Sequence, residues 1–205
     1  MPQELLTDPA KKYATYYTTR KDNAWAEANP DEIQQEYLIS DRHTARGTTL
    51  RIHLMDGFHT QQLKVNTLDD PKRWWEVVDR TTGEVVPTDK WFFDEPTGEV
   101  EIETIPYHEY TVSFLAFLIW DPVHMYNFLT NDWKDTPHQL TYDVRQPKTQ
   151  AYVKEKLRRW CEANPHIDVV RFTTFFTSHA DIRRPEAREI RRVVRLQRQR
   201  QPLHP

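Results

Sequence analysis

The stretch LTYDVRQPKTQAYVKEKLRRWCEANPHIDVVRFTTFF, residues 140–176, decides the expected fold. Its first four residues predict a short strand. Pro147 then begins a helix of about fifteen residues, whose apolar positions follow helical spacing up to Asn164-Pro165. A β-branched and aromatic strand follows at 168–176. Strand, helix and strand in this order form a βαβ unit, which implies a parallel sheet.

Two parallel α/β architectures fit such a unit, a doubly wound sheet and a (β/α)8 barrel. The glycine content favours one of them. The chain has four glycines in 205 residues, about 2%, against roughly 7% in ordinary proteins. No two of them lie close enough in the sequence to build a phosphate-binding loop of the Rossmann or Walker type. The prediction is therefore an α/β protein with a partial TIM-type (β/α)8 barrel.

A β-hairpin region is predicted to be inserted in this barrel at about residues 50–105. One hairpin is expected over 75–86, with its turn around Gly83. A second is expected over 91–103, where a turn at Gly98 precedes a segment of clear period-two alternation.

Two further strands flank the insert. Residues 37–42 predict a short buried strand that ends in polar residues. Residues 110–120 form a continuous apolar run, which is typical of a strand buried on both faces. The run stops at Asp121, and Pro122 is expected to open a helix.

The formal net charge of −3 combines two unlike segments. Residues 178–205 contain eight arginines, no lysine, three acidic residues and no aromatic residue, so their net charge is +5. Residues 1–177 then carry −8. This shift predicts a barrel domain over 1–177 and an arginine-rich tail over 178–205 that is disordered or irregular.

No targeting or membrane segment is predicted. The N-terminal residues Met1-Pro2-Gln3-Glu4 lack the basic-then-apolar order of a signal peptide, and the run at 110–120 is too short to span a bilayer. We therefore expect a cytoplasmic protein. The single cysteine, Cys161, excludes a disulfide framework and a cysteine-based metal site.

Charged residues follow three predicted strands, where a barrel places its working groups: Asp41-Arg42, Asp121 and Asp143. Helix N-capping is the alternative role for each aspartate. Arg171 lies within an apolar strand, where a guanidinium needs a carboxylate, a phosphate or sugar hydroxyls. Structural pairing and ligand binding fit Arg171 equally well.

Other kinds of site find little support. The nine histidines show no metal-binding spacing, so no metal ligand is predicted. Surface positions are expected for His108 and His124, which flank the long strand. The sequence has no G-x-S-x-G elbow, and Cys161 has no local activator, so neither serine nor cysteine is expected to act as a nucleophile.

Three long strings closely resemble one family: WWEVVDRTTGEVV (74–86), HEYTVSFLAFLIWDPVHMYNFLTNDW (108–133) and DVVRFTTFF (168–176). The family is the 1,3-β-galactosyl-N-acetylhexosamine phosphorylases, also called galacto-N-biose/lacto-N-biose phosphorylases. The similarity runs over about residues 9–177 and includes Tyr17-Thr18-Thr19-Arg20. It implies a large multi-domain enzyme with an N-terminal (β/α)8-type barrel.

The resemblance also implies a reaction, catalysed by an inverting hexosyltransferase. A β-1,3-galactoside of an N-acetylhexosamine reacts with phosphate to give α-galactose 1-phosphate and the free hexosamine. An acid protonates the departing oxygen while phosphate attacks from the opposite face, in place of the water of an inverting hydrolase. The implied partners are a small disaccharide and inorganic phosphate as co-substrate, with no cofactor. Intact family members are expected to form homo-oligomers.

Carried over position by position, the resemblance places Asp121, Pro122, Val123 and Asn127 at the acceptor-sugar subsite. Asn127 both donates and accepts hydrogen bonds, and Val123 offers an apolar wall. Arg171 matches an arginine that helps to hold the substrate. His124 stands where some relatives have Glu, and no role is predicted for it.

Two departures from the family bear on activity. Family members begin with a further segment, and their general acid is an Asp downstream of the strand at 168–176. No residue here matches that acid, so no catalytic residue is predicted. A truncated fragment that is inactive alone is expected, and its status as an enzyme stays open. The alternatives are a non-catalytic sugar-binding remnant or, with less support, a nucleic-acid binder that uses the basic tail.

The tail itself suggests a frameshift. Residues 182–202 permit a choice of codons that, read one base later, gives FDDQKREKFVEWFGYSASVSP. This string resembles the continuation of the family and contains the aromatics and glycine that the tail lacks. A single-base frameshift near Thr177 is therefore predicted. A gene that encodes the tail in frame, with no phosphorylase sequence in the shifted frame, would contradict it.

Overall fold

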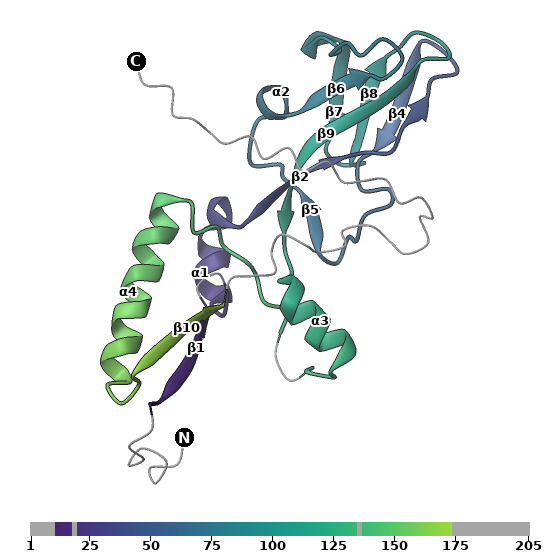
Figure 1. Cartoon of the computed structure of the whole chain (residues 1–205). Helices are drawn as coiled ribbons and strands as arrows, with labels where there is room; N and C mark the ends of the chain where they lie inside the picture. The colour runs from purple at the N-terminus through teal and green to yellow at the C-terminus, as the bar shows by residue number, and fades with distance from the viewer. Residues whose placement is uncertain (1–10, 18–19, 135–136, 174–205) are drawn as a thin grey trace, which may run out of the picture. The chain divides into compact units, whose positions relative to one another are not determined.

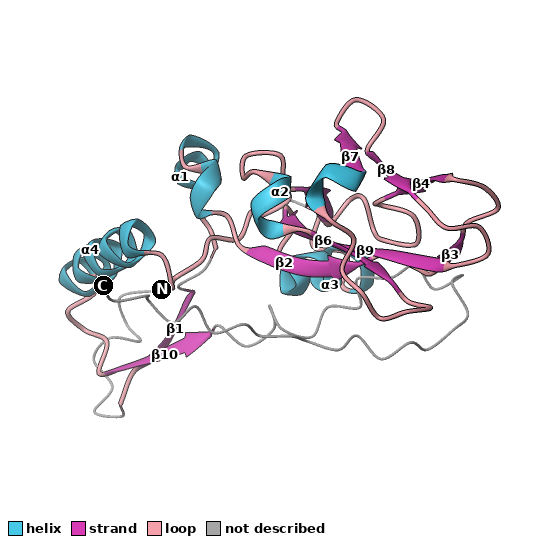
Figure 2. Cartoon of the chain, turned by 90° about the horizontal axis from the view of Figure 1, so that it is seen from above, coloured by secondary structure: helices cyan, strands magenta, loops and turns pink. Residues whose placement is uncertain are grey.

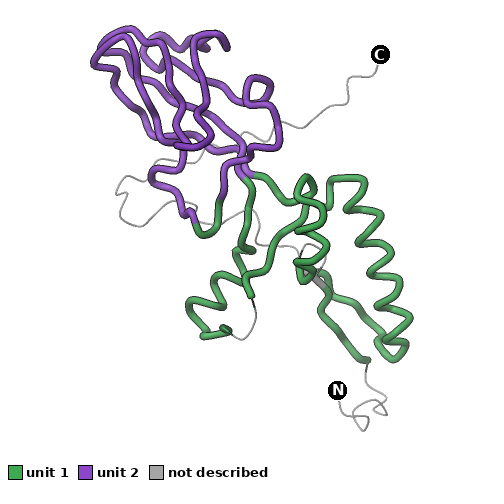
Figure 3. Tube along the Cα trace, turned by 180° about the vertical axis from the view of Figure 1, so that it is seen from behind, with its two compact units in different colours: residues 1–35, 61–63, 117–181 green, residues 36–60, 64–116, 182–205 purple. Residues whose placement is uncertain are grey.

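A computed structural model of the chain describes residues 11–17, 20–134 and 137–173. They form two compact units (Figure 3). Unit 1 contains the described residues up to 35, residues 61–63 and residues from 117 onward. Unit 2 contains residues 36–60 and 64–116. The predicted boundary near residue 177 and the arginine-rich tail lie outside the described residues.

A parallel strand pair joins the first and last strands of the described part of unit 1. Strand β1 (Tyr13–Tyr17) pairs with β10 (Val169–Thr173), with Tyr13 opposite Val169, and the two strands lie side by side in Figures 1 and 2. The prediction of a strand near 168–176 is confirmed for its described part. The strand lies in a parallel pair, but not with residues 140–143 as the predicted βαβ unit requires. Its partner is β1, which the sequence patterns did not predict.

The strand predicted over 140–143 is wrong. Tyr142 forms only an isolated antiparallel bridge with Ile33. The segment is held by its side chains instead, because the Thr141 hydroxyl donates to the Leu118 carbonyl at 2.8 Å and Tyr142 is fully buried. The segment has the composition of a strand because its β-prone side chains are suited to burial, but it forms no strand ladder.

Helix α4 (Pro147–Ala163) confirms the predicted helix and its end before Asn164-Pro165. Its N-terminus is satisfied from a distant part of the chain. The buried Glu32, at the end of the 3-10 helix η2 (Pro30–Glu32), accepts hydrogen bonds from the Thr149 backbone N–H at 2.9 Å and the Thr149 hydroxyl at 2.5 Å. A carboxylate at this end of a helix also suits the helix dipole.

The core of unit 1 gathers around helix α1 (Asn23–Ala28), which Asp22 caps by accepting from the Trp25 backbone N–H. Trp25 stacks on Tyr152 of α4 with ring centroids 4.3 Å apart. The buried members of this core are few: Ala26, Ile33, Phe117 and Tyr142.

In unit 2, most of a five-stranded sheet is organised around the long strand β9 (Glu109–Leu118), whose residues are nearly all buried. Its partners are β2 (Gln35–Ile39), β3 (His43–Thr44), β5 (Leu63–Val65) and β6 (Glu76–Asp79). The buried strand predicted over 110–120 is thus confirmed. The strand expected over 37–42 begins and ends earlier, and most of its residues are only half-buried.

A three-stranded antiparallel sheet completes unit 2, in the order β4 (Thr49–His53), β8 (Glu99–Glu103) and β7 (Trp91–Asp94). Two short helices, α2 (Pro71–Trp74) and η3 (Thr88–Lys90), lie in the connections. The hairpin predicted over 91–103 is confirmed, and Gly98 in its turn has a φ of +69°, which suits glycine.

The hairpin predicted over 75–86 is much reduced. Strand β6 ends at Asp79, and only the isolated bridge between Val78 and Val85 joins its two arms. Across the described residues the fold is therefore mixed α/β with open sheets rather than a closed barrel. No helix among them is long and apolar enough to cross a membrane.

Candidate functional site

The most closely held polar residues of unit 1 lie where β9 passes into helix α3 (Pro122–Thr130) (Figure 1). Asp121 is the N-cap of α3, and its Oδ1 accepts from the His124 backbone N–H at 2.8 Å. Pro122 occupies the first position of the helix, as predicted. The alternative of helix N-capping is therefore confirmed for Asp121.

Asp121 also forms a buried ion pair. Its Oδ1 accepts a hydrogen bond from Nη1 of Arg20, and the two side chains are 3% and 8% exposed. A buried carboxylate without a counter-charge is costly, and Arg20 removes that cost because it stays protonated at any ordinary pH. Sequence patterns missed Arg20 because its partner lies 101 residues away. The only available signal was its place in the string Tyr17-Thr18-Thr19-Arg20.

Arg20 is fixed at its backbone as well. The Tyr142 hydroxyl donates to the Arg20 carbonyl at 2.8 Å, and Nζ of Lys156 donates to that hydroxyl at 3.3 Å. Burial, with the nearby Asp22 and Tyr16, raises the pKa of Tyr142, so its hydroxyl keeps its proton and remains a donor. Arg20 thus links the Tyr142 segment to the start of α3.

A group of aromatic rings surrounds the first turn of α3. Nε1 of Trp120 donates to Nδ1 of His124 at 2.9 Å, which places the proton of a neutral His124 on Nε2. His138 stacks on Trp120 with ring centroids 3.4 Å apart, and Phe128 meets both rings edge-on. The expected surface position of His124 is wrong, since it is buried.

The remaining predicted acceptor-site residues lie on the first two turns of α3. Pro122 is buried, and Val123 and Asn127 are half-buried. Nδ2 of Asn127 donates to the Val123 carbonyl at 2.8 Å, and its Oδ1 accepts from Nδ2 of Asn131 at 2.7 Å. Each of these amide atoms can make a second hydrogen bond, so Asn127 keeps capacity for a ligand.

Arg171 lies on a separate element. It stands in β10 opposite Thr15 of β1, and it is exposed. The expectation that an apolar strand would bury its guanidinium is therefore wrong. The residues of β10 whose burial is described, 169–172, are themselves half-buried or exposed, so the apolar sequence did not report burial.

The other predicted strand-end carboxylate of unit 1, Asp143, follows no strand. It accepts from the backbone N–H and from the guanidinium of Arg145, at 2.6 to 3.0 Å. It is not the cap of α4 either, because Gln146 holds that position. Among the described residues no group of three or more His, Cys, Asp or Glu is placed to hold a metal ion, and Cys161 is exposed.

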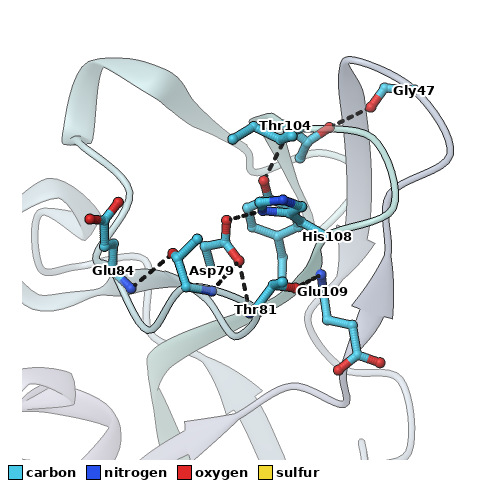
Figure 4. A network of polar contacts seen from close by, with 10 residues as sticks. Gly47, Asp79, Thr81, Glu84, Thr104, His108 and Glu109 are labelled. Atoms are coloured by element: carbon cyan, nitrogen blue, oxygen red, sulfur yellow. Dashed lines mark hydrogen bonds and ion pairs between the residues drawn. The ribbon is translucent and has the colours of Figure 1, made fainter.

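Unit 2 has its own buried carboxylate, Asp79, at the end of β6 (Figure 4). Its Oδ1 accepts from the backbone N–H groups of Thr81 and Thr82, and its Oδ2 lies 2.7 Å from Nδ1 of His108. Burial acts to raise the pKa of Asp79, but these hydrogen bonds outweigh it and hold the pKa below its ordinary value.

Two further contacts close this network. The Thr81 hydroxyl accepts from the Glu109 backbone N–H at 2.9 Å, and the Tyr110 hydroxyl accepts from the Ile105 backbone N–H at 2.9 Å. His108 is half-buried, so the surface position expected for it is only partly right. The network ties the turn after β6 to the start of β9, which is a structural use of its charges.

Comparison with known proteins identifies relatives of the chain. Residues 1–190 match the family model described as the lacto-N-biose phosphorylase N-terminal TIM barrel domain. Two 1,3-β-galactosyl-N-acetylhexosamine phosphorylases of Lachnoclostridium phytofermentans are 65% and 56% identical to it, over 86% and 85% of the chain. A 1,3-β-galactosyl-N-acetylhexosamine phosphorylase of Bifidobacterium longum is 48% identical over 86% of the chain.

These matches cover 25%, 24% and 24% of the relatives, so the chain spans about a quarter of their length. The extent of the family match and the level of identity both agree with the resemblance carried by the three long sequence strings. The chain belongs to the lacto-N-biose phosphorylase N-terminal TIM barrel domain family.

Proposed function

We propose that this chain supplies the acceptor-sugar part of an inverting phosphorylase that acts on β-1,3-galactosyl-N-acetylhexosamines. The family match and the names of its relatives support this substrate class. We also propose that β1, β10 and α4 represent one section of a (β/α)8 barrel, into which the β-rich unit 2 is inserted. A parallel strand pair accompanied by a helix is the repeating element of such barrels.

The observation that carries the proposal is the placement of Val123 and Asn127 directly after a long buried strand. They stand four residues apart on α3 and are joined by the hydrogen bond from Asn127 to the Val123 carbonyl. An apolar side chain beside an amide with spare capacity suits an N-acetylhexosamine, whose acetyl methyl is apolar and whose amide and hydroxyls are polar.

The proposed reaction consumes one phosphate and transfers one proton to the leaving group. A phosphate oxygen forms a bond to the anomeric carbon while the glycosidic C–O bond breaks, and an acid gives its proton to the departing oxygen. We assign the acid to no described residue. Arg171 is assigned to substrate or phosphate binding, since its exposed guanidinium is accessible to an anion or to sugar hydroxyls.

Acceptor binding is tested with N-acetylglucosamine and the purified chain, by saturation-transfer NMR and by ligand-induced shifts of backbone amides. Asn127→Ala is expected to weaken binding by about tenfold, because one polar contact to the sugar is lost. Gln150→Ala, an exposed substitution on α4, serves as the control and is expected to bind normally. Equal binding by Asn127→Ala and the parent chain would rule out the assigned site.

Turnover is tested separately, by measuring galactose 1-phosphate formed from lacto-N-biose and phosphate. Release of galactose 1-phosphate supports a complete phosphorylase. Sugar binding without release is the result expected of an acceptor-site fragment that is inactive alone, and it equally fits the non-catalytic sugar-binding remnant that the sequence leaves open. If the chain neither binds N-acetylglucosamine nor releases galactose 1-phosphate, the proposed function is refuted.

A further inference from the structure

We propose that Arg20 is a positioning residue of the acceptor-sugar site, and that Asp121 serves the protein rather than the sugar. This inference rests on the proposed function, because the site it positions is the one formed by Val123 and Asn127. Arg20 would act by holding the Asp121 carboxylate in the one orientation that fixes the first turn of α3.

Asp121 makes hydrogen bonds through its side chain and its backbone. Its Oδ1 receives both Nη1 of Arg20 and the His124 backbone N–H. Its backbone N–H donates to the Gln139 carbonyl at 2.8 Å, and its carbonyl accepts from the Met125 N–H at 2.8 Å. With only 2% of the residue exposed, this carboxylate is unsuited to direct contact with a sugar.

Arg20 is held as firmly as its partner. It is buried, and the Tyr142 hydroxyl anchors its carbonyl from a segment that follows α3 in the sequence. The backbone from which the Arg20 guanidinium reaches Asp121 is therefore anchored, and the side chain itself is buried. A planar guanidinium orients a carboxylate better than a flexible ammonium does, so arginine and lysine are not equivalent here.

The orientation of Asp121 determines where the binding groups lie. The cap fixes the backbone N–H of His124, the residue that follows Val123. Asn127 lies on the next turn and bonds to the Val123 carbonyl, so its position depends on the same first turn. Loss of the counter-charge leaves the buried carboxylate to turn away or to take up a proton, and the cap changes with it. Small displacements of positioned groups cost up to about a hundredfold in function.

The first measurement does not depend on sugar binding. In a ¹H–¹⁵N NMR spectrum, Arg20→Gln is expected to shift the His124 backbone amide and the Asn127 side-chain amide, while Arg20→Lys shifts them less. The control is Arg158→Gln, which removes an exposed arginine paired with Glu155 and Glu162, and it should move neither signal. Unchanged His124 and Asn127 signals in Arg20→Gln would overturn the positioning role.

The second measurement separates positioning from stability. Arg20→Gln is expected to lower the melting temperature by on the order of 5–15 °C, and to weaken N-acetylglucosamine binding by about tenfold or more. The double variant Arg20→Gln with Asp121→Asn leaves no unpaired buried charge, so it should recover much of the melting temperature. Its sugar affinity should stay low, because the orienting ion pair is still missing.

The outcomes distinguish the two proposals. Recovery of sugar affinity together with stability in the double variant would show that Arg20 only stabilises the fold. If the parent chain binds no N-acetylglucosamine, the proposed function fails, and the His124 and Asn127 signals alone decide whether Arg20 positions α3. Should Arg20→Gln fail to fold, the comparison of Arg20→Lys and the double variant with the parent chain provides the same decision.

Discussion

Each unit of this protein contains a buried aspartate at the end of a strand, and the two are paired differently. Asp121 of unit 1 and Asp79 of unit 2 both accept backbone N–H groups from the residues that follow them. Asp121 is neutralised by Arg20, whereas Asp79 faces His108, which carries a charge only when protonated. The same local device is therefore paired with a permanent cation in one unit and with an imidazole in the other.

The difference bears on what each aspartate can do. A pairing with arginine suits a site whose geometry must not change with conditions, and it stands beside the residues assigned to the acceptor sugar. A pairing with histidine, within a turn that joins two strands, suits a structural contact.

The largest effect is expected from Asp121→Ala, which removes the carboxylate of the buried ion pair with Arg20. Breaking one side of a buried ion pair costs about 3–5 kcal/mol. Native-state hydrogen exchange should show the loss at unit 1 amides such as Leu118 and Asp143, and less of it at unit 2 amides such as Ser40 and Val86. Equal losses in both units would break the contrast.

A smaller loss is expected from Asp79→Asn. The amide oxygen still accepts from the turn, but the charge beside His108 disappears, at a cost of about 1–3 kcal/mol. Protection of the Ser40 and Val86 amides should fall, while unit 1 amides respond less. A greater effect on Leu118 than on Ser40 would contradict the assignment of Asp79 to unit 2.

A pH effect should follow from the lowered pKa of Asp79. Because the folded state prefers the ionised form, this contribution to stability is complete above the ordinary aspartate pKa of about 3.9. It is lost as the pH falls below that value and through the folded pKa. Hydrogen-exchange protection of the parent chain and of Asp79→Asn is measured between pH 6 and pH 3, and the difference between them isolates this contribution. The difference should shrink on acidification, and a difference that grows would refute the prediction.

The smallest effect is expected on the exposed face of α4. Hydrogen bonds from Arg158 and Arg159 lower the pKa of Glu155 to about 2, yet all three side chains are in contact with solvent. Arg158→Gln should raise the pKa of Glu155 in an NMR titration and leave the melting temperature unchanged. A clear drop in the melting temperature would contradict this prediction, because it would show that an exposed ion pair contributes measurably to the stability of the protein.

Local patterns predicted the elements that are long and regular. The apolar run of β9, the proline start of α3 and the helical spacing of α4 each reflect forces that act within a few residues. The hairpin of β7 and β8 was predictable for the same reason, since its turn requires a glycine. Asp121, Pro122, Val123 and Asn127 were brought together because all four belong to one helix and its cap.

Long-range contacts explain what the patterns missed. Residues 140–143 have the composition of a strand, but Tyr142 is buried by packing against Trp25 and Tyr152, and its hydroxyl bonds to the Arg20 backbone, without a strand ladder. Strand β1 pairs with β10 at the far end of the described chain, and Arg20 pairs with Asp121 at the N-cap of α3. Nothing near Arg171 in the sequence revealed that its strand is largely exposed.

Hydrogen-bonded partners in unit 1 lie far apart in the sequence, and this separation affects the order in which the units fold. The Lys12 backbone N–H donates to Asp168 across 156 residues, whereas the described part of unit 2 is continuous in sequence except for residues 61–63. The cost of closing a loop rises with its length, and contacts that close long loops slow folding. When unit 2 folds, the hydrogen bond from Ser40 to Val112 joins its two ends and shortens the loop that unit 1 must close. We therefore expect unit 2 to form first during synthesis and act as the nucleus, and unit 1 to assemble only after α4 and β10 have been made.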